Sequence, residues 1–253
     1  MNLKDLKKSS LLAEICGIHA GDGYLRNDGK RRELDISGNI EEKGYYDQHV
    51  IPLFENFFNI KIEGRYFPHR NTYGFVIRKK EIIEFMHKIG FPYGSKSLKV
   101  KILDFILKNN SLKKYFLRGY FDTDGCLSFG KRSMSSYSEF KKTRHYYPLI
   151  SFSTVSKYLS KDLKIILKEL NFKFYPSKYQ PKRNLESLRY RIDLNGVKNL
   201  NKWLDEVCIA NPTKYSRFLI WKKYCFCPPN TNYSQRLKIL KNRLNPNLLY
   251  KGL

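Results

Sequence analysis

Hydrophobic and polar positions along the chain form two successive blocks with the same order of patterns. Each block begins with an apolar helix-like run, followed by two alternating segments, a segment of helical periodicity, a second alternating pair and a short amphipathic helix. After the helix that ends at Asp22, we expect elements at 24–26, 32–37, 41–58, 61–66, 73–78 and 80–89. After the helix that ends at Asp124, we expect them at 126–129, 149–153, 156–170, 172–179, 187–193 and 197–207. Each block predicts an αββαββα unit, so the fold class is α+β, a tandem repeat joined near 108–111.

The two blocks share a motif at the end of their first helix. Residues 15–23 read ICGIHAGDG and residues 117–125 read LRGYFDTDG, so both runs end in Asp-Gly. Glycine just after a helix is typical of a left-handed C-cap, and we expect that conformation at Gly23 and Gly125. Asp22 and Asp124 then lie in the last turn, where the helix dipole disfavours a carboxylate by about 0.3–1 kcal/mol. Two acids in matched, unfavourable positions indicate a functional site rather than two ordinary helix ends.

Small residues on these helices favour a close approach between them. They are Ala13, Gly17, Ala20 and Gly21 in the first helix and Gly119 and Thr123 in the second. Helices with such faces can pack backbone to backbone, which would bring Asp22 and Asp124 together. Two neighbouring carboxylates need a compensating cation, and oxygen ligands suit Mg²⁺ or a similar divalent ion. The pattern therefore predicts metal-assisted phosphodiester hydrolysis.

With these two motifs, the sequence resembles the LAGLIDADG homing endonucleases in their monomeric, two-motif form. The second copy is close to the family pattern, whereas Ile15 and Cys16 replace the leading Leu-Ala of the first and Ala20 replaces its first acid. The resemblance extends to about Phe226. It implies a pseudo-symmetric repeat with motif helices at the interface and saddle-shaped sheets on DNA. The halves are expected at 1–110 and 111–228, with a basic tail at 229–253.

The resemblance also implies a reaction and a metal site. Family members cut both strands of a long DNA site across the minor groove and leave 3′ overhangs. Their metal ligand is the acid before the final glycine, which both copies keep. The metal site is therefore expected at Asp22 and Asp124, together with the residues that precede them, Gly21 and Thr123. The additional acid of the second copy, Asp122, is expected to form hydrogen bonds at the helix end.

Two lysines are candidates for the remaining catalytic roles. The family places a basic residue near each scissile phosphate, after the last helix of each half. Lys96 and Lys214 occupy comparable positions, and Lys99 and Lys101 compete with Lys96 for the first. A positive group there would stabilise the charge that develops on the phosphate in the transition state. His19, inside the first motif, is expected to pack in the core.

The charge of the chain favours a nucleic-acid partner. The 253 residues carry a net charge of +25, and no acid occurs from Val207 to Leu253. Binding to phosphates, with release of counterions, compensates such self-repulsion. Outward polar side chains on the expected strands and their turns suit the bases and phosphates of double-stranded DNA. They are Arg26, Arg31, Arg32, Glu33, Asp35, Ser37, Arg65, Arg70, Arg78, Lys131, Arg132, Gln180, Lys182, Arg183, Arg189 and Arg191.

The sequence is also compatible with two other functions, and it indicates a cellular compartment. A group I intron maturase that binds intron RNA, or a non-cleaving DNA-binding regulator, would use the same fold, although both acids are kept. Met1 and the end Lys251-Gly252-Leu253 do not match an intein, so a free-standing, intron-encoded monomer is expected. Five cysteines without a CxxC pair, no apolar span and no secretory signal predict a reduced, intracellular protein without structural zinc. The tail, with Arg236, Lys238, Lys241 and Arg243, is either a basic arm on DNA or a solvated end.

Overall fold

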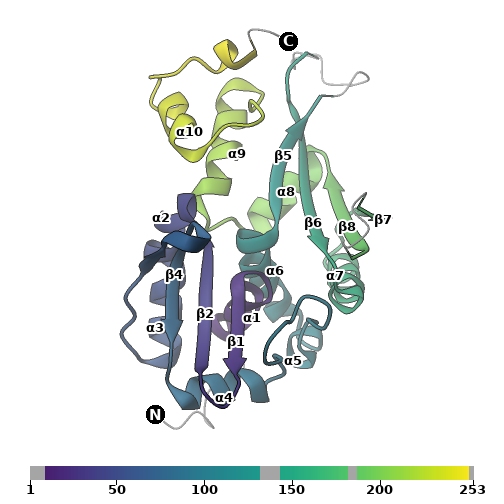
Figure 1. Ribbon diagram of the computed structural model, residues 1–253. Coiled ribbons are helices and arrows are strands. Elements are labelled where there is room, and N and C mark those ends of the chain that lie inside the picture. Colours follow the sequence, from purple (N-terminus) through teal and green to yellow (C-terminus); the bar gives the residue numbers. More distant parts are fainter. Residues whose placement is uncertain (1–8, 132–142, 182–186, 251–253) are drawn as a thin grey trace.

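A computed structural model describes residues 9–131, 143–181 and 187–250 and contains two αββαββα units (Figure 1). The first unit consists of α1 (Ser10–Asp22), β1 (Gly23–Asn27), β2 (Arg32–Asn39), a helical segment ending in α3 (Ile51–Phe58), β3 (Arg65–Phe67), β4 (Thr72–Ile77) and α4 (Lys80–Lys88). The segment before α3 passes through a 3₁₀ turn (Ile40–Glu42), α2 (Lys43–Tyr45) and a π-helical turn (Tyr46–Val50). A second 3₁₀ turn, Pro68–Arg70, joins β3 to β4.

The second unit repeats this order after the short helix α5 (Asp104–Leu107). It consists of α6 (Asn110–Asp124), β5 (Cys126–Gly130), β6 (Tyr147–Thr154), α7 (Lys157–Glu169), β7 (Tyr175–Tyr179), β8 (Arg189–Asn195) and α8 (Val197–Glu206). Two further helices, α9 (Pro212–Tyr224) and α10 (Tyr233–Leu240), and a 3₁₀ turn (Pro246–Tyr250) follow. The α+β tandem repeat expected from the sequence is confirmed.

Each unit has one antiparallel four-stranded sheet. The strand orders are β1-β2-β4-β3 and β5-β6-β8-β7, so the two sheets have the same topology. In β2, Leu34, Ile36 and Gly38 are buried while the residues between them are partly exposed. This alternation follows from the period-two geometry of a strand with one face on the core. One face of each sheet is thus left for an external partner.

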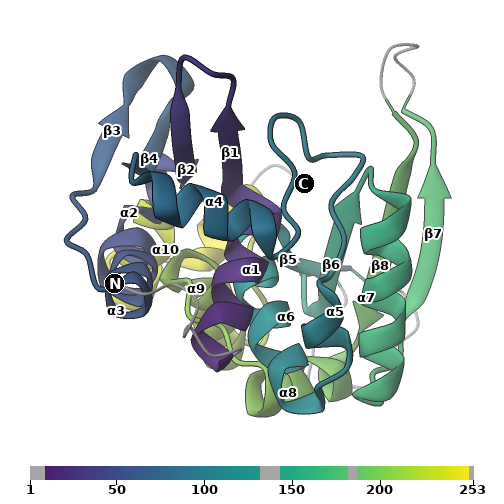
Figure 2. The same cartoon turned by 90° about the horizontal axis from the view of Figure 1, so that it is seen from below.

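The motif helices α1 and α6 pack against each other between the two sheets (Figure 2). A Cβ atom at Gly17 would lie 2.2 Å from the main-chain oxygen of Phe116. A Cβ atom at Gly119 would lie 2.4 Å from the main-chain oxygen of Glu14. Only glycine fits at either position, because the atoms it would displace belong to the backbone of the other helix. The close approach predicted from the small residues is therefore confirmed.

The two motif glycines adopt a different conformation from the one expected. Gly23 has φ −83° and Gly125 has φ −75°, both extended, so the prediction of left-handed caps is wrong. Space, rather than backbone freedom, requires glycine here. An added Cβ would lie 1.9 Å from Nδ1 of His19 at the first position and 2.3 Å from Cδ2 of Phe121 at the second. In each unit the backbone therefore passes directly from the motif helix to the next strand, and the glycine packs against an aromatic ring, that of His19 in the first unit and that of Phe121 in the second.

The C-terminal region is folded from Pro212 to Tyr250, with α10 packed on α9. Arg236 is only 2% exposed and donates to Oγ of Ser216 (2.8 Å) and to the main-chain oxygens of Thr213 (3.2 Å) and Thr231. The expectation of a solvated or DNA-contacting side chain is wrong for Arg236, because these acceptors satisfy its guanidinium inside the fold. Lys238, Lys241 and Arg243 are exposed. None of the helices in the described parts of the chain is long and apolar enough to span a membrane.

Candidate active site

Asp22 and Asp124 come together where α1 and α6 end. A Cβ atom at Gly21 would lie 2.1 Å from Oγ1 of Thr123 and 3.3 Å from Cγ of Asp124, so the two motif ends are in contact. Burial, together with the negative charges of Asp124 and Glu42, raises the pKa of Asp22 to about 7, against the hydrogen bond from Tyr46 and the charge of Lys214. Loss of hydration likewise raises the pKa of Asp124, against Lys96 and Lys214. The motif ends therefore carry an acid pair that favours a cation.

Lys96 and Lys214 each bind the end of one motif helix. Nζ of Lys96 donates to the main-chain oxygens of His19 and Gly21, both at 2.6 Å, and to that of Gly23. Nζ of Lys214 donates to the main-chain oxygens of Phe121 (2.7 Å) and Thr123 (2.6 Å). These carbonyls carry the negative end of the helix dipole, so an ammonium group is favourable there. The structure thus places both lysines in matched positions beside the acid pair.

The two lysines lie in different kinds of secondary structure. Lys96 lies in the irregular segment after α4, as expected, and loss of hydration lowers its pKa to about 8 despite the nearby charges of Asp124 and Asp22. Lys214 lies in the first turn of α9, a helix that the sequence did not predict. Lys99 and Lys101 are both exposed, whereas Lys96 is partly buried against α1. Geometry therefore favours Lys96 over its two rivals.

The acid pair fits a hydrated divalent cation better than a closed metal site. In the described residues, no three His, Cys, Asp or Glu side chains form a group that could hold a metal ion. Two neighbouring carboxylates whose pKa values are raised by burial supply the oxygen donors that Mg²⁺ accepts while it keeps several waters. The main-chain oxygens of Gly21 and Thr123 already accept hydrogen bonds from the lysines. The carboxylates of Asp22 and Asp124, rather than the main-chain oxygens of Gly21 and Thr123, are therefore the groups that could bind a divalent cation.

Three residues at the site were missed by the sequence analysis. The phenol of Tyr46 donates to Oδ2 of Asp22 at 2.7 Å. A Cβ atom at Gly38 would lie 2.6 Å from that same oxygen, 2.9 Å from Oη of Tyr46 and 3.2 Å from Oε2 of Glu42. The space left by Gly38 thus admits three polar groups to the motif end. A glycine inside a strand is the one signal that could have indicated this close approach.

Asp122 and His19 have the roles expected of them. Asp122 is fully buried and accepts from the main-chain nitrogen of Ala210 at 2.9 Å, and burial raises its pKa to about 7. His19 is also fully buried, with its ring centroid 4.2 Å from that of Phe91. Burial lowers the pKa of His19 well below its usual value, so it is neutral. Both side chains are thus enclosed in the interior beside the motif helices.

Several of the polar side chains expected to contact DNA form ion pairs, either with an acid of β2 or with a residue two positions away in the chain. Arg78 bonds Glu33 at 3.0 Å and Arg70 bonds Asp35 at 2.8 Å. Arg191 bonds Asp193 at 2.8 Å, and Arg26 bonds Asp28 at 2.6 Å. Ser37 donates to Asp35 at 2.9 Å. These pairs hold arginine side chains on the sheets. Glu33 and Asp35, the two acids expected to contact DNA, are each paired with an arginine.

The other residues of this set are distributed around the same faces. Arg31, Arg32, Arg65, Lys131 and Gln180 are exposed. Arg189 lines a pocket of about 250 Å³ that also includes Lys96, Asp124 and Thr154, so it lies beside the acid pair. We call this the Lys96 pocket. Arg132, Lys182 and Arg183 lie outside the described residues.

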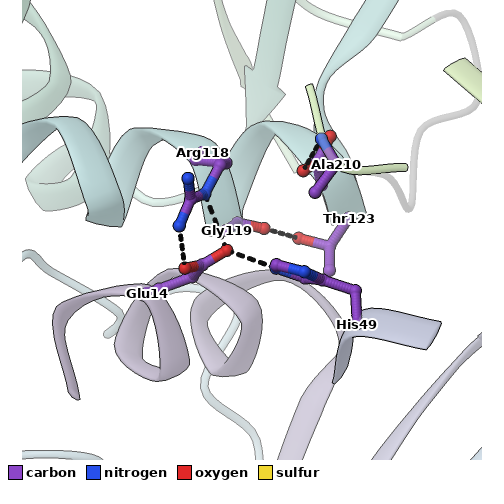
Figure 3. Close-up of polar contacts among 7 residues, drawn as sticks. Glu14, His49, Arg118, Gly119, Thr123 and Ala210 are labelled. Carbon is purple, nitrogen blue, oxygen red and sulfur yellow. Dashed lines mark hydrogen bonds and ion pairs between the residues drawn. The ribbon is translucent and has the colours of Figure 1, made fainter. Parts of the chain in front are cut away.

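A buried ion cluster joins the two halves away from the acid pair (Figure 3). Glu14 of α1 is 1% exposed and accepts from Nε of Arg118 on α6 at 2.8 Å and contacts Nε2 of His49 at 2.6 Å. Burial opposes ionisation of Glu14, but the hydrogen bonds of His49 and Arg118 outweigh it and lower its pKa. The ion pair of Glu14 with Arg118 therefore links α1 of the first half to α6 of the second.

Comparison with known proteins agrees with this architecture. Residues 111–208 match the LAGLIDADG-like domain family. The homing endonuclease I-DmoI in complex with DNA and Mn has a similar fold, with a TM-score of 0.51 and 15% identity over 79% of this chain and 96% of that chain. A mesophilic variant of I-DmoI gives a TM-score of 0.50 and 15% identity over 79% of this chain and 95% of that chain. The chain thus has the LAGLIDADG homing endonuclease fold.

One curated relative has a detectable sequence similarity. The replication factor C small subunit of Methanocaldococcus jannaschii is 28% identical over 201 residues, which are 79% of this chain. The chain spans only about a tenth of the length of that protein. Residues 111–208 therefore contain a LAGLIDADG-like domain, and the chain as a whole has a fold similar to that of the homing endonuclease I-DmoI.

Proposed function

We propose that the protein is a site-specific double-strand DNA endonuclease that hydrolyses phosphodiester bonds with a divalent cation, Mg²⁺ in the cell. The observation that carries this proposal is the meeting of two acids and two lysines at the adjacent ends of α1 and α6. Those ends lie between two sheets whose outer faces carry arginine. The two acids and two lysines therefore lie beside the sheet surfaces that we propose contact DNA.

Each group has a role in the proposed reaction. Asp22 and Asp124 hold the cation, which when bound polarises the phosphate and lowers the pKa of water. Lys96 and Lys214 bring a positive charge to the two motif ends, where negative charge builds on each phosphate in the transition state. Their bonds to main-chain oxygens hold the ammonium groups in place before DNA binds.

The surface of the protein supports a long, asymmetric target. The two sheets have the same topology but different outward residues, for example Asp35 and Arg70 on one and Arg191 on the other. A single chain with two unlike halves would read a non-palindromic duplex. Cutting across the minor groove would leave 3′ overhangs, and intron homing is the biological setting we infer for such an enzyme.

A selection followed by a cleavage assay tests this function. Duplexes with a long randomised segment are selected for binding in Ca²⁺, and the selected sites are then incubated with Mg²⁺ in a supercoiled plasmid. We expect linear product with 3′ overhangs at one asymmetric site. Specific binding to DNA without cleavage would instead indicate a regulator. Tight binding to structured intron RNA without DNA cleavage would indicate a maturase.

A further inference from the structure

Glu42 reaches the second motif end from the first half of the chain. It ends the 3₁₀ turn after β2, and its Oε1 accepts from Nδ2 of Asn211 at 2.7 Å. Asn211 is fully buried and also donates to the main-chain oxygen of Asp122 at 2.8 Å. Its Oδ1 accepts from the main-chain nitrogen of Thr213 at 3.0 Å, which caps α9. One amide thus links Glu42, the end of α6 and the helix that carries Lys214.

Glu42 and Lys214 also share a pocket of about 230 Å³, which Gly125 and Thr213 help to line. We call it the Lys214 pocket. Burial raises the pKa of Glu42, whereas the charge of Lys214 and the hydrogen bond from Asn211 oppose that rise. The ammonium group of Lys214 therefore has a carboxylate neighbour supplied by the other half. An opposite charge at a partly buried position restrains a flexible lysine.

The Lys96 pocket has no corresponding carboxylate among the described residues that line it, apart from Asp124 itself. Strand register identifies the equivalent positions. Tyr24 pairs with Asp35, and Cys126, which like Tyr24 follows a motif glycine, pairs with Ser151. Gly38 therefore corresponds to Thr154, and the residue four positions later, Glu42, corresponds to Tyr158. The side chain of Tyr158 is 61% exposed and is not an acid.

We propose that Glu42 is a positioning residue for Lys214, contributed by the first half, and that it makes the two strand-cutting centres unequal. This inference rests on the endonuclease function proposed above. Glu42 and Asn211 hold the start of α9 so that Lys214 lies against the end of α6. Among the described residues that line its pocket, Lys96 has no carboxylate neighbour other than Asp124. Neutralising Glu42 should consequently affect the cutting of one strand.

The first test measures lysine accessibility in the protein without DNA. Glu42→Gln keeps an oxygen for Asn211 and removes only the charge. Its control is Glu41→Gln, the preceding exposed glutamate, whose Oε2 accepts from the main-chain nitrogen of Tyr233 at 3.2 Å. Acetylation rates are measured by mass spectrometry, with Lys96 as the internal reference. In Glu42→Gln we expect Lys214 to react roughly three- to tenfold faster, the scale of losing one charge partner at a partly buried site.

The second test follows each DNA strand separately under single-turnover conditions on the selected site. With Glu42→Gln we expect one strand to be cut about tenfold more slowly, less than the roughly 10²-fold cost of removing a transition-state group, because Lys214 itself is still present. The other strand should keep its rate and nicked DNA should accumulate, while Glu41→Gln matches the wild type. Unchanged Lys214 acetylation, or equal slowing of both strands, would overturn the inference. A wild type that cuts neither strand would refute the endonuclease function, and the acetylation rates would still show whether Glu42 holds Lys214.

Discussion

At the scale of single residues, Asp22 and Asp124 share a proposed role as cation ligands in unlike surroundings. Asp22 accepts a hydrogen bond from Tyr46, whereas Asp124 lines the Lys96 pocket. We expect Asp22→Asn or Asp124→Asn to abolish cleavage, because an amide cannot replace a charged ligand of the cation. Affinity for the site in Ca²⁺ should stay within about tenfold, since most of the binding energy comes from phosphate contacts elsewhere. Gel-shift titration and plasmid cleavage measure the two effects. Near-normal cutting by either variant would refute the metal assignment.

The lysines give a second prediction at this scale. Lys96→Met or Lys214→Met should slow cleavage by roughly 10²-fold or more, the cost of losing one transition-state donor. Lys→Arg variants at the same positions keep the positive charge and serve as controls, which should lose less activity. Site affinity should change little, because each ammonium group binds main-chain oxygens of its motif helix. Single-turnover rates equal to those of the wild type in both methionine variants would exclude these lysines from the reaction.

At the scale of elements, the contact between α1 and α6 depends on two glycines. Gly119→Ala would place a Cβ atom against the main-chain oxygen of Glu14, at 2.4 Å in the present geometry. We expect a loss of roughly 1–3 kcal/mol in the free energy of unfolding, typical of overpacking against atoms that cannot move aside. Urea denaturation measures it. Gly130→Ala is the control, because no atom lies within 4 Å of its added Cβ, and it should be nearly neutral.

At the scale of the whole molecule, the cluster of Glu14, Arg118 and His49 holds the two halves together. The pKa of Glu14 is lowered, so its charge stabilises the fold above the ordinary carboxyl pKa, and that contribution is lost as pH falls through the lowered value. Glu14→Gln should cost about 1–3 kcal/mol at neutral pH, less than a fully buried pair because Arg118 and His49 are partly solvated.

Unfolding curves between pH 3 and pH 7 test this contribution. The difference between Glu14→Gln and the wild type should shrink toward pH 3, where the wild-type carboxyl also becomes protonated. Glu169→Gln is the control: Glu169 bonds Lys113 at 2.6 Å but is 45% exposed, so its loss should cost less than about 1 kcal/mol. A pH-independent difference for Glu14→Gln would mean that shape, rather than charge, joins the halves.

The binding mode is a prediction for the whole molecule as well. The net charge of +25 and the arginine-bearing sheets predict that affinity falls steeply with salt. A protein that neutralises about 6–10 phosphates should lose roughly 10³–10⁵ in affinity between 50 and 200 mM salt. Fluorescence anisotropy on the selected duplex measures this slope, and sedimentation of the complex gives its stoichiometry. A palindromic optimum, or two chains on one site, would contradict recognition by two unlike halves.

The sequence was informative wherever the relevant signal is local. The alternation of Leu34 and Ile36 with polar residues predicted which face of β2 is buried, because side chains of a strand point alternately to either side. The small residues Gly17 and Gly119 predicted a close helix contact. The family resemblance directed attention to Lys96 and Lys214, although α9 itself was missed. Its apolar and basic residues are not arranged along one face, so periodicity gave no signal.

What the sequence determined by itself is the tandem αββαββα fold, the two acids at matched helix ends and a surface suited to a polyanion. Only the tertiary structure decided that Tyr46 and Glu42 join Asp22 across the space left by Gly38, and that Glu14 links the halves. It also decided that Arg236 is buried, where the sequence indicated either a basic arm on DNA or a solvated end. The physical reason is the range of the interactions. Periodicity and spacing report contacts within one element, whereas hydrogen bonds and charges between residues far apart in the chain exist only once the elements have packed.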